Sequence, residues 1–272
     1  MFRLKKILSA SLTAAALASL ITSASHAKTF DEKICANLKQ GEKVGIVKCG
    51  DIFGNTRGTA VFSVEKFENK NEAPVSSLMV CPGEDVYPVE PYSVYIEAIE
   101  LCDLDGDGRD DVVYARRGGV HNILEVKVLK QAGFEKSGKP CFVELFKSEG
   151  LDNGRFDIVK SEDKKTLPMV VVGGFVNAPG SSEPHLEYSR MYRFTGGKNK
   201  SLQKVKSVTS TPASISQEYE YAYLLLSEND KAEGLKRMKR LAESLKNTKS
   251  QGNLAILREC NEIIAKHEKT RN

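Results

Sequence analysis

The chain has 272 residues, with 40 Lys and Arg against 36 Asp and Glu. This length is enough for one large domain, or for a domain with an appendage. The nearly balanced charge excludes a nucleic-acid-binding role based on overall charge, because such a role would need a strong basic surplus or a local patch.

The first 27 residues are typical of a secretory signal peptide. Arg3, Lys5 and Lys6 form a charged start, an apolar stretch follows over 7–21, and Ser25-His26-Ala27 supplies small residues for a cleavage site. The alternative is a membrane anchor, but the apolar stretch is shorter than the roughly 20 residues that cross a bilayer. We therefore expect a periplasmic or secreted protein with no transmembrane segment after cleavage. Residues 28–272 then carry 37 basic and 36 acidic side chains.

All six cysteines follow this segment: Cys35, Cys49, Cys81, Cys102, Cys141 and Cys260. An even number in an oxidising compartment predicts disulfide bonds. Many pairings are open, and the sequence does not choose among them. The pairs Cys35–Cys49 and Cys81–Cys102 would close the shortest loops. Since no CxxC motif is present, a redox or zinc-knuckle role has little support.

Residues 28–212 form the predicted β-rich domain. Short segments rich in β-branched and aromatic residues are bounded there by Gly, Pro, Asn and Asp, as strands are. The clearest of them are 59–64, 112–114, 123–129 and 169–172. Residues 123–129 alternate in part between apolar and charged side chains, which predicts a strand with one face in water.

Residues 213–272 form a predicted helical segment. Its clearest apolar residues recur every three or four positions: Leu235, Met238, Leu241 and Leu245. This spacing places them on one helical face. A further helix is expected after a break at 250–253, and a shorter one over 218–226. The predicted fold is therefore mainly β with a C-terminal α-helical segment, α+β overall.

The end of this helical segment is basic. Residues 231–272 contain eleven Lys and Arg against five Glu. One interpretation is an amphipathic appendage that contacts an anionic partner, such as membrane headgroups, a cell-wall polymer or an acidic protein. The other is a helical hairpin packed on the β-rich domain with its charged face in water. Cys260 favours the second, because a disulfide to that domain would hold the helices in place.

An internal repeat organises the β-rich region. Asp103–Tyr114 aligns without a gap with Asp51–Phe62, which lies 52 residues earlier. Asp aligns with Asp, Gly with Gly, Arg with Arg, and each segment ends in an apolar triplet. A weaker third copy is Ser161–Val172. The repeat predicts strand-loop-strand units.

The second copy carries a calcium-type loop. Asp103, Asp105, Asp107 and Asp111 occupy loop positions 1, 3, 5 and 9, with Arg109 at position 7. Calcium takes about six to eight oxygen ligands, and spacing by two directs successive carboxylates toward one centre. Carboxylates this close would repel one another without a cation between them. The predicted ligands are the four carboxylates and the main-chain carbonyl of Arg109, whose side chain we expect to face solvent.

The loop differs from a helix-loop-helix calcium site, which ends in a bidentate Glu and is flanked by helices. The twelfth position here is Tyr114, and the residues before it are typical of a strand. We therefore expect calcium to have a structural role. The alternative is an Asp/Gly-rich hairpin turn without a metal. The other two copies should be metal-free, because Phe53 and Thr59 replace ligands in one, and Lys164 and Lys165 lie in the other.

Asp103–Tyr114 resembles the loop of FG-GAP or VCBS-type repeats, which form blades of integrin-like β-propellers. The resemblance implies calcium ligands at Asp103, Asp105, Asp107, the Arg109 carbonyl and Asp111. It also implies a role in adhesion or ligand binding. Three copies fall short of the about four or more blades that close a propeller. The resemblance therefore supports propeller-like or sandwich-like strand repeats rather than a whole propeller.

The sequence assigns no catalytic residue. It has no HExxH motif, no GxSxG motif and no phosphate-binding glycine loop. His121 and His185 are isolated. We therefore predict an exported, non-enzymatic calcium-binding protein that binds a protein or a cell-envelope ligand. A secreted or periplasmic hydrolase that uses acidic residues near the loop is the alternative, and an inhibitor or accessory protein that acts through the helical segment is a third reading.

Overall fold

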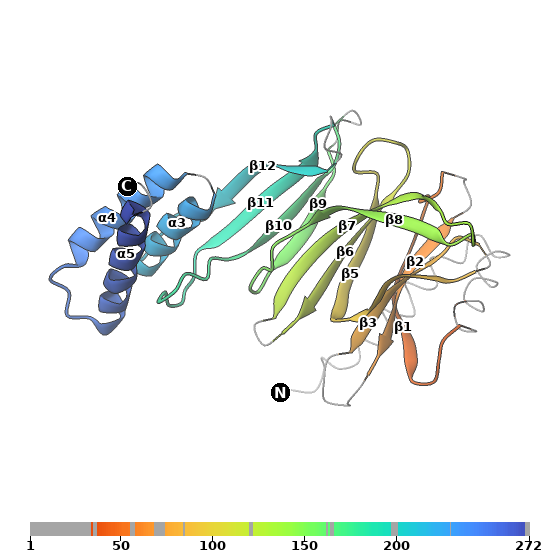
Figure 1. Cartoon of the computed structure of the whole chain (residues 1–272), viewed down its shortest axis with the longest axis horizontal. Coiled ribbons are helices and arrows are strands. Elements are labelled where there is room, and N and C mark those ends of the chain that lie inside the picture. The colour runs from red at the N-terminus through yellow and green to blue at the C-terminus, as the bar shows by residue number, and fades with distance from the viewer. Residues whose placement is uncertain are drawn as a thin grey trace, which may run out of the picture.

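The computed structural model describes residues 34, 37–54, 58–67, 74–83, 85–119, 122–161, 163, 166–196, 201–228 and 230–269. The predicted signal peptide 1–27, Cys35 and His121 lie outside these ranges. In the described ranges, twelve strands form three four-stranded antiparallel sheets, and three helices follow them (Figure 1). The expected fold, mainly β with a C-terminal helical segment and α+β overall, is confirmed.

Every strand pairs only with its neighbours in the chain, so each sheet is an antiparallel meander. The first sheet contains β1 (Glu42–Gly50), β2 (Thr59–Lys66), β3 (Val75–Cys81) and β4 (Tyr87–Ser93). The second contains β5 (Tyr95–Cys102), β6 (Asp111–Gly118), β7 (Ile123–Phe134) and β8 (Pro140–Lys147). The third contains β9 (Arg155–Val159), β10 (Met169–Phe175), β11 (Glu187–Phe194) and β12 (Leu202–Thr209).

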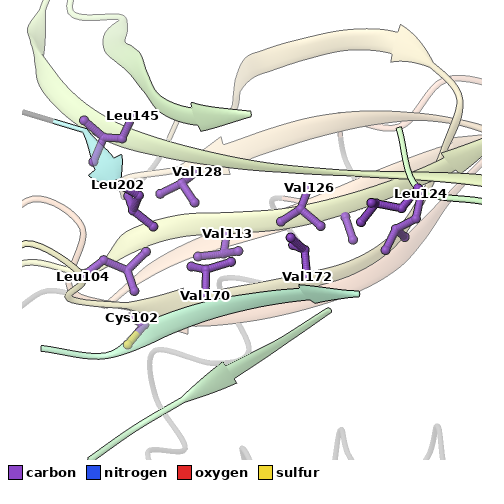
Figure 2. Packing of buried hydrophobic residues seen from close by; sticks show 12 residues of the cluster. Cys102, Leu104, Val113, Leu124, Val126, Val128, Leu145, Val170, Val172 and Leu202 are labelled. Atoms are coloured by element: carbon purple, nitrogen blue, oxygen red, sulfur yellow. The ribbon is translucent and has the colours of Figure 1, made fainter. Parts of the chain in front are cut away.

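The sheets pack face to face through alternating apolar side chains. One apolar core lies between the first and second sheets and includes Leu78, Ile99 and Tyr114. A second lies between the second and third sheets, where Val113 and Val126 face Val170 and Val172 (Figure 2). Because side chains alternate along a strand, the second sheet supplies one face to each core. The sheets therefore follow one another along the molecule, with the helices beyond the third (Figure 1).

The three segments that align in the sequence occupy equivalent places in the three sheets. Each lies between the first and second strands of its sheet, over 51–58, 103–110 and 160–168, of which 55–57, 162, 164 and 165 are outside the described residues. The first two turns are also bonded to each other. The Asp110 N–H donates to the Asp51 carbonyl at 2.8 Å, and the Asp51 N–H donates to the Asp110 carboxylate at 2.9 Å. These two hydrogen bonds attach the β5–β6 turn of the second sheet to the β1–β2 turn of the first sheet.

The helical segment consists of α3 (Ile215–Ser227), α4 (Lys231–Leu245) and α5 (Gln251–Lys269). Side-chain caps begin the first two helices: Ser214 accepts from the Gln217 N–H, and Asp230 accepts from the Glu233 N–H. Of the apolar face expected from the sequence, Met238, Leu241 and Leu245 are buried in a core shared by all three helices, whereas Leu235 is half-buried outside it. No helix of the described residues is both long and apolar enough to cross a membrane.

The positions of Cys81, Cys102 and Cys260 do not agree with the disulfide bonds considered in the sequence analysis. Cys102 is a buried thiol between the second and third sheets, whereas Cys81 packs with Phe62 on the outer face of the first sheet. The Cys81–Cys102 disulfide is therefore not formed. Cys260 is a thiol buried among the apolar side chains of the helices, beside Ala178. Non-covalent contacts, rather than the expected Cys260 disulfide, join the helical segment to the rest of the described chain.

Candidate metal centre

Asp103 organises the turn between β5 and β6. Its carboxylate accepts hydrogen bonds from the N–H groups of Gly106 at 2.7 Å, Asp107 at 3.2 Å and Gly108 at 2.9 Å. Gly106 and Gly108 have φ values of +78° and +83°. Glycine adopts this left-handed region without the steric cost of a Cβ atom. The tight path that brings the aspartates together therefore depends on both glycines.

Three carboxylates converge in this turn. Asp103, Asp105 and Asp111 each offer an oxygen, and these oxygens lie within 4.8 Å of one another. Asp111 is only 3% exposed. Among the described residues its carboxylate accepts one hydrogen bond, from the Leu104 N–H at 3.1 Å. The pKa of Asp111 is raised to about 7, mainly by burial and also by the charges of Asp105 and Asp107, against the Leu104 hydrogen bond and the charge of Lys130, which lower it. A hard cation with oxygen ligands, such as calcium, fits this set.

Asp107 lies beside this group but pairs with basic side chains. It accepts from the Arg109 guanidinium at 2.7 Å and from the Lys130 ammonium at 2.7 Å. Burial alone would raise the pKa of Asp107, but these hydrogen bonds outweigh it and lower the pKa to about 2. The Arg109 guanidinium also donates to Gln131 at 3.4 Å. The Arg109 side chain is 38% exposed, so it reaches solvent as expected, but it also pairs with Asp107 and Gln131.

Lys130 is the residue of this site that sequence reasoning missed. It comes from β7, and its ammonium contacts Asp105 as well as Asp107. The β6–β7 register pairs Val112 with Leu129, so the next residue of β7 lies opposite the start of β6, where the acidic turn ends. Lys130 is 25 residues from Asp105 in the chain, so no local spacing indicates this contact. It could have been predicted only from the register of the antiparallel hairpin that β6 and β7 form.

A cavity of about 700 Å³ opens beside the turn. Asp105, Asp107, Arg109 and Lys130 line one side of it, and apolar residues such as Phe194 of β11 line another. It therefore lies between the second and third sheets. Neither Asp103 nor Asp111 is among its lining residues.

The equivalent turn of the first sheet shows a different use of the same framework. Asp51 accepts from the Gly54 N–H at 2.7 Å, much as Asp103 accepts from Gly106. Position 3, however, is Phe53, whose ring stacks on Phe134 with centroids 5.3 Å apart. In the third turn, Asp163 accepts from the Thr166 hydroxyl. Lys164 and Lys165 lie outside the described residues. Among those described, only the second turn brings together enough acidic side chains for a metal.

The isolated histidine His185 is part of a buried polar contact. Its Nδ1 lies 2.5 Å from the Glu220 carboxylate, and Glu220 is fully buried. The same carboxylate accepts from the Leu186 N–H at 2.5 Å. This arrangement joins α3 to the loop that precedes β11.

Comparison with known proteins gives little further information. No known protein family matches the chain, and no curated protein sequence matches it. One solved structure, titled "Crystal structure of CarG", aligns with 49% of this chain and 94% of its own chain at 14% identity, with a TM-score of 0.29. Similarity of this size supports no conclusion about function. These comparisons give no support to the resemblance to FG-GAP or VCBS-type repeats, which stays a prediction from the sequence.

Proposed function

We propose that this chain is an exported, non-enzymatic binding or envelope-associated protein, and that its β5–β6 turn holds a structural calcium ion. The observation that carries the proposal is the convergence of Asp103, Asp105 and Asp111 within 4.8 Å. The turn also connects all three sheets. Leu104 is fully buried in the core between the second and third sheets, and Asp110 is bonded to Asp51 beside the first. A cation in this turn would stabilise both sheet interfaces.

The donor set suits calcium because it consists of carboxylate oxygens. Asp103, Asp105 and Asp111 would hold the ion, and Asp107 and the Arg109 carbonyl are the further candidates from the sequence. Calcium would supply the positive charge that the buried Asp111 carboxylate lacks. Hard cations of this kind commonly stabilise the conformation of a turn rather than act in catalysis. Their oxygen ligands come from several positions of the turn and so order the backbone between them.

The hydrolase alternative has less support. Acid–base catalysis needs a carboxyl group whose pKa is raised and which reaches the substrate. The carboxylates that line the cavity are instead paired with cations: Asp105 and Asp107 with Lys130, and Glu144 with Lys127 at 3.4 Å. These ion pairs occupy the acidic side chains that a hydrolase mechanism would use.

The partner is proposed from the compartment and from the helical segment. An exported, non-enzymatic chain with a basic end would contact a protein or a cell-envelope ligand. Exposed basic side chains lie on α4, on α5 and in the connection between them: Lys231, Lys236, Lys239, Arg240, Lys246, Lys249, Arg258, Lys266 and Lys269. Some of them pair within the bundle, as Lys239 does with Glu268 at 2.6 Å. The remaining surplus would face an anionic surface.

Calcium should raise the melting temperature of residues 28–272. An ion present at about a hundred times its dissociation constant contributes about 2.7 kcal/mol of stability to the folded state. For a domain of this size, that corresponds to a rise of about 5–10 °C. Differential scanning calorimetry in calcium and in chelator measures it.

Two variants test the assignment of the ligands. Asp105→Asn should remove the difference between calcium and chelator. Asp157→Asn, which changes an exposed carboxylate on β9, should keep it. Equal melting temperatures of the wild-type protein in calcium and in chelator would show that the turn is an Asp-rich turn without a metal.

A further inference from the structure

Lys130 places a positive charge inside the acidic turn. Its ammonium contacts Asp105 and lies 2.7 Å from the Asp107 carboxylate. The contact is largely shielded from water, since the side chains of Lys130 and Asp105 are 22% and 9% exposed. The turn therefore contains a cation supplied by the chain itself, on one of the three carboxylates that converge.

Calcium and this ammonium cannot share Asp105 without cost. Asp105 belongs to the group of oxygens that lie within 4.8 Å of one another, and it is also the residue that Lys130 contacts. A divalent ion bound to that group would stand close to the lysine charge, and like charges repel strongly in a partly buried site. Each cation therefore weakens the binding of the other.

We propose that Lys130 is a built-in counter-cation, which neutralises Asp105 and Asp107 when calcium is absent and which calcium displaces when it binds. This inference rests on the proposed calcium site and concerns how that site is regulated. Lys130 lines the cavity of about 700 Å³ beside the turn, so the displaced side chain has room to move without disturbing the core. Competition of this kind lowers the affinity for calcium. Weak sites, with dissociation constants of about 10⁻⁴–10⁻³ M, suit calcium-rich compartments outside the cell.

Arg109 provides the matched comparison. It also neutralises Asp107, at 2.7 Å, and it donates to Gln131; among the described residues, no hydrogen bond or ion pair joins it to Asp105. Arg109→Gln removes the same unit of charge from the same turn, and it leaves the main-chain carbonyl in place. The competition model therefore predicts a much larger effect for Lys130 than for Arg109.

Calorimetric titration of residues 28–272 with calcium chloride tests the inference. We expect Lys130→Gln and Lys130→Met to bind calcium at least about tenfold more tightly than wild type, which is about 1.4 kcal/mol at room temperature. Lys130→Arg keeps the charge and should bind like wild type, and Arg109→Gln should gain clearly less than Lys130→Gln. Two replacements that remove the charge are used, so that a failure of one to fold leaves the other to be measured.

A second readout separates competition from a merely structural contact. In chelator, Lys130→Gln should melt below wild type, because Asp105 loses the ammonium that contacts it and Asp107 keeps only Arg109. In saturating calcium, it should melt at or above wild type. A structural contact alone would lower both melting temperatures equally.

Three outcomes are decisive. If wild type binds calcium and Lys130→Gln binds it no more tightly, the competition is refuted and the calcium site stands. If neither protein binds calcium, the site itself is refuted and the inference falls with it. If only Lys130→Gln binds calcium, the competition is supported, and the wild-type turn is held by its lysine instead.

Discussion

Leu104→Ala should lower the free energy of unfolding by about 2–5 kcal/mol, the range observed when a buried leucine is cut back to alanine. Leu104 is fully buried, although it lies in the turn between two of the candidate ligands. It packs in the core between the second and third sheets, on the side where Val170 and Leu202 lie (Figure 2). The substitution removes apolar contacts and leaves a cavity, and both effects destabilise the folded state.

Urea unfolding at a constant calcium concentration measures this loss. Ile52→Ala is the matched variant, because Ile52 is the equivalent residue of the first turn, is also fully buried, and packs between the first and second sheets. We expect a similar loss of stability for Ile52→Ala but an unchanged response to calcium. Leu104→Ala should also weaken calcium binding, since it loosens the turn that carries the ligands.

Val143→Ala is the surface control for both variants. Val143 is 46% exposed on β8, so its truncation should change the free energy of unfolding by less than about 0.5 kcal/mol. A loss for Leu104→Ala that is no larger than the loss for Val143→Ala would mean that Leu104 does not anchor the turn in the core.

The repeat and the apolar alternation were enough to predict four of the six inner strands that the structure describes: β2, β6, β7 and β10. The segments 59–64, 112–114, 123–129 and 169–172 all lie within strands, because each carries the apolar side chains that fill a core between sheets. The outer strands were not predictable in this way. β4 contains two prolines, and β12 is mostly exposed. Outer strands form because a neighbouring strand offers hydrogen bonds, and this information is not local to their own sequence.

In the candidate site, too, some features follow from the local sequence and others depend on the tertiary structure. The spacing of Asp103, Asp105 and Asp111 is local, and the turn does bring these three side chains together. The pairing of Asp107 with Lys130 is not local, since it depends on the register between β6 and β7. Spacing alone therefore named four carboxylates as equivalent, whereas the tertiary structure pairs two of them, Asp105 and Asp107, with Lys130.

Glu220→Ala should have the second large effect, a loss of about 3 kcal/mol. Removing one partner of a buried charged or hydrogen-bonded pair costs about that much, because the other partners stay buried without it. Glu220 and Leu186 are both fully buried. The carboxylate accepts from the Leu186 N–H at 2.5 Å and lies 2.5 Å from His185 Nδ1. The substitution would leave the Leu186 N–H without its acceptor at the contact between α3 and the third sheet.

Hydrogen–deuterium exchange locates this effect. We expect exchange to accelerate at the Leu186 amide and through α3, while the amides of β6 and β7 remain protected, because the lost contact joins the helices to the third sheet only. Glu218→Ala is the matched control: Glu218 lies on the same helix, is 35% exposed, and pairs with Arg237 at 2.8 Å. Exposed pairs of this kind contribute about 0–1 kcal/mol. Unchanged exchange at Leu186 in Glu220→Ala would mean that apolar packing around Ala178, rather than the buried carboxylate, docks the helical segment.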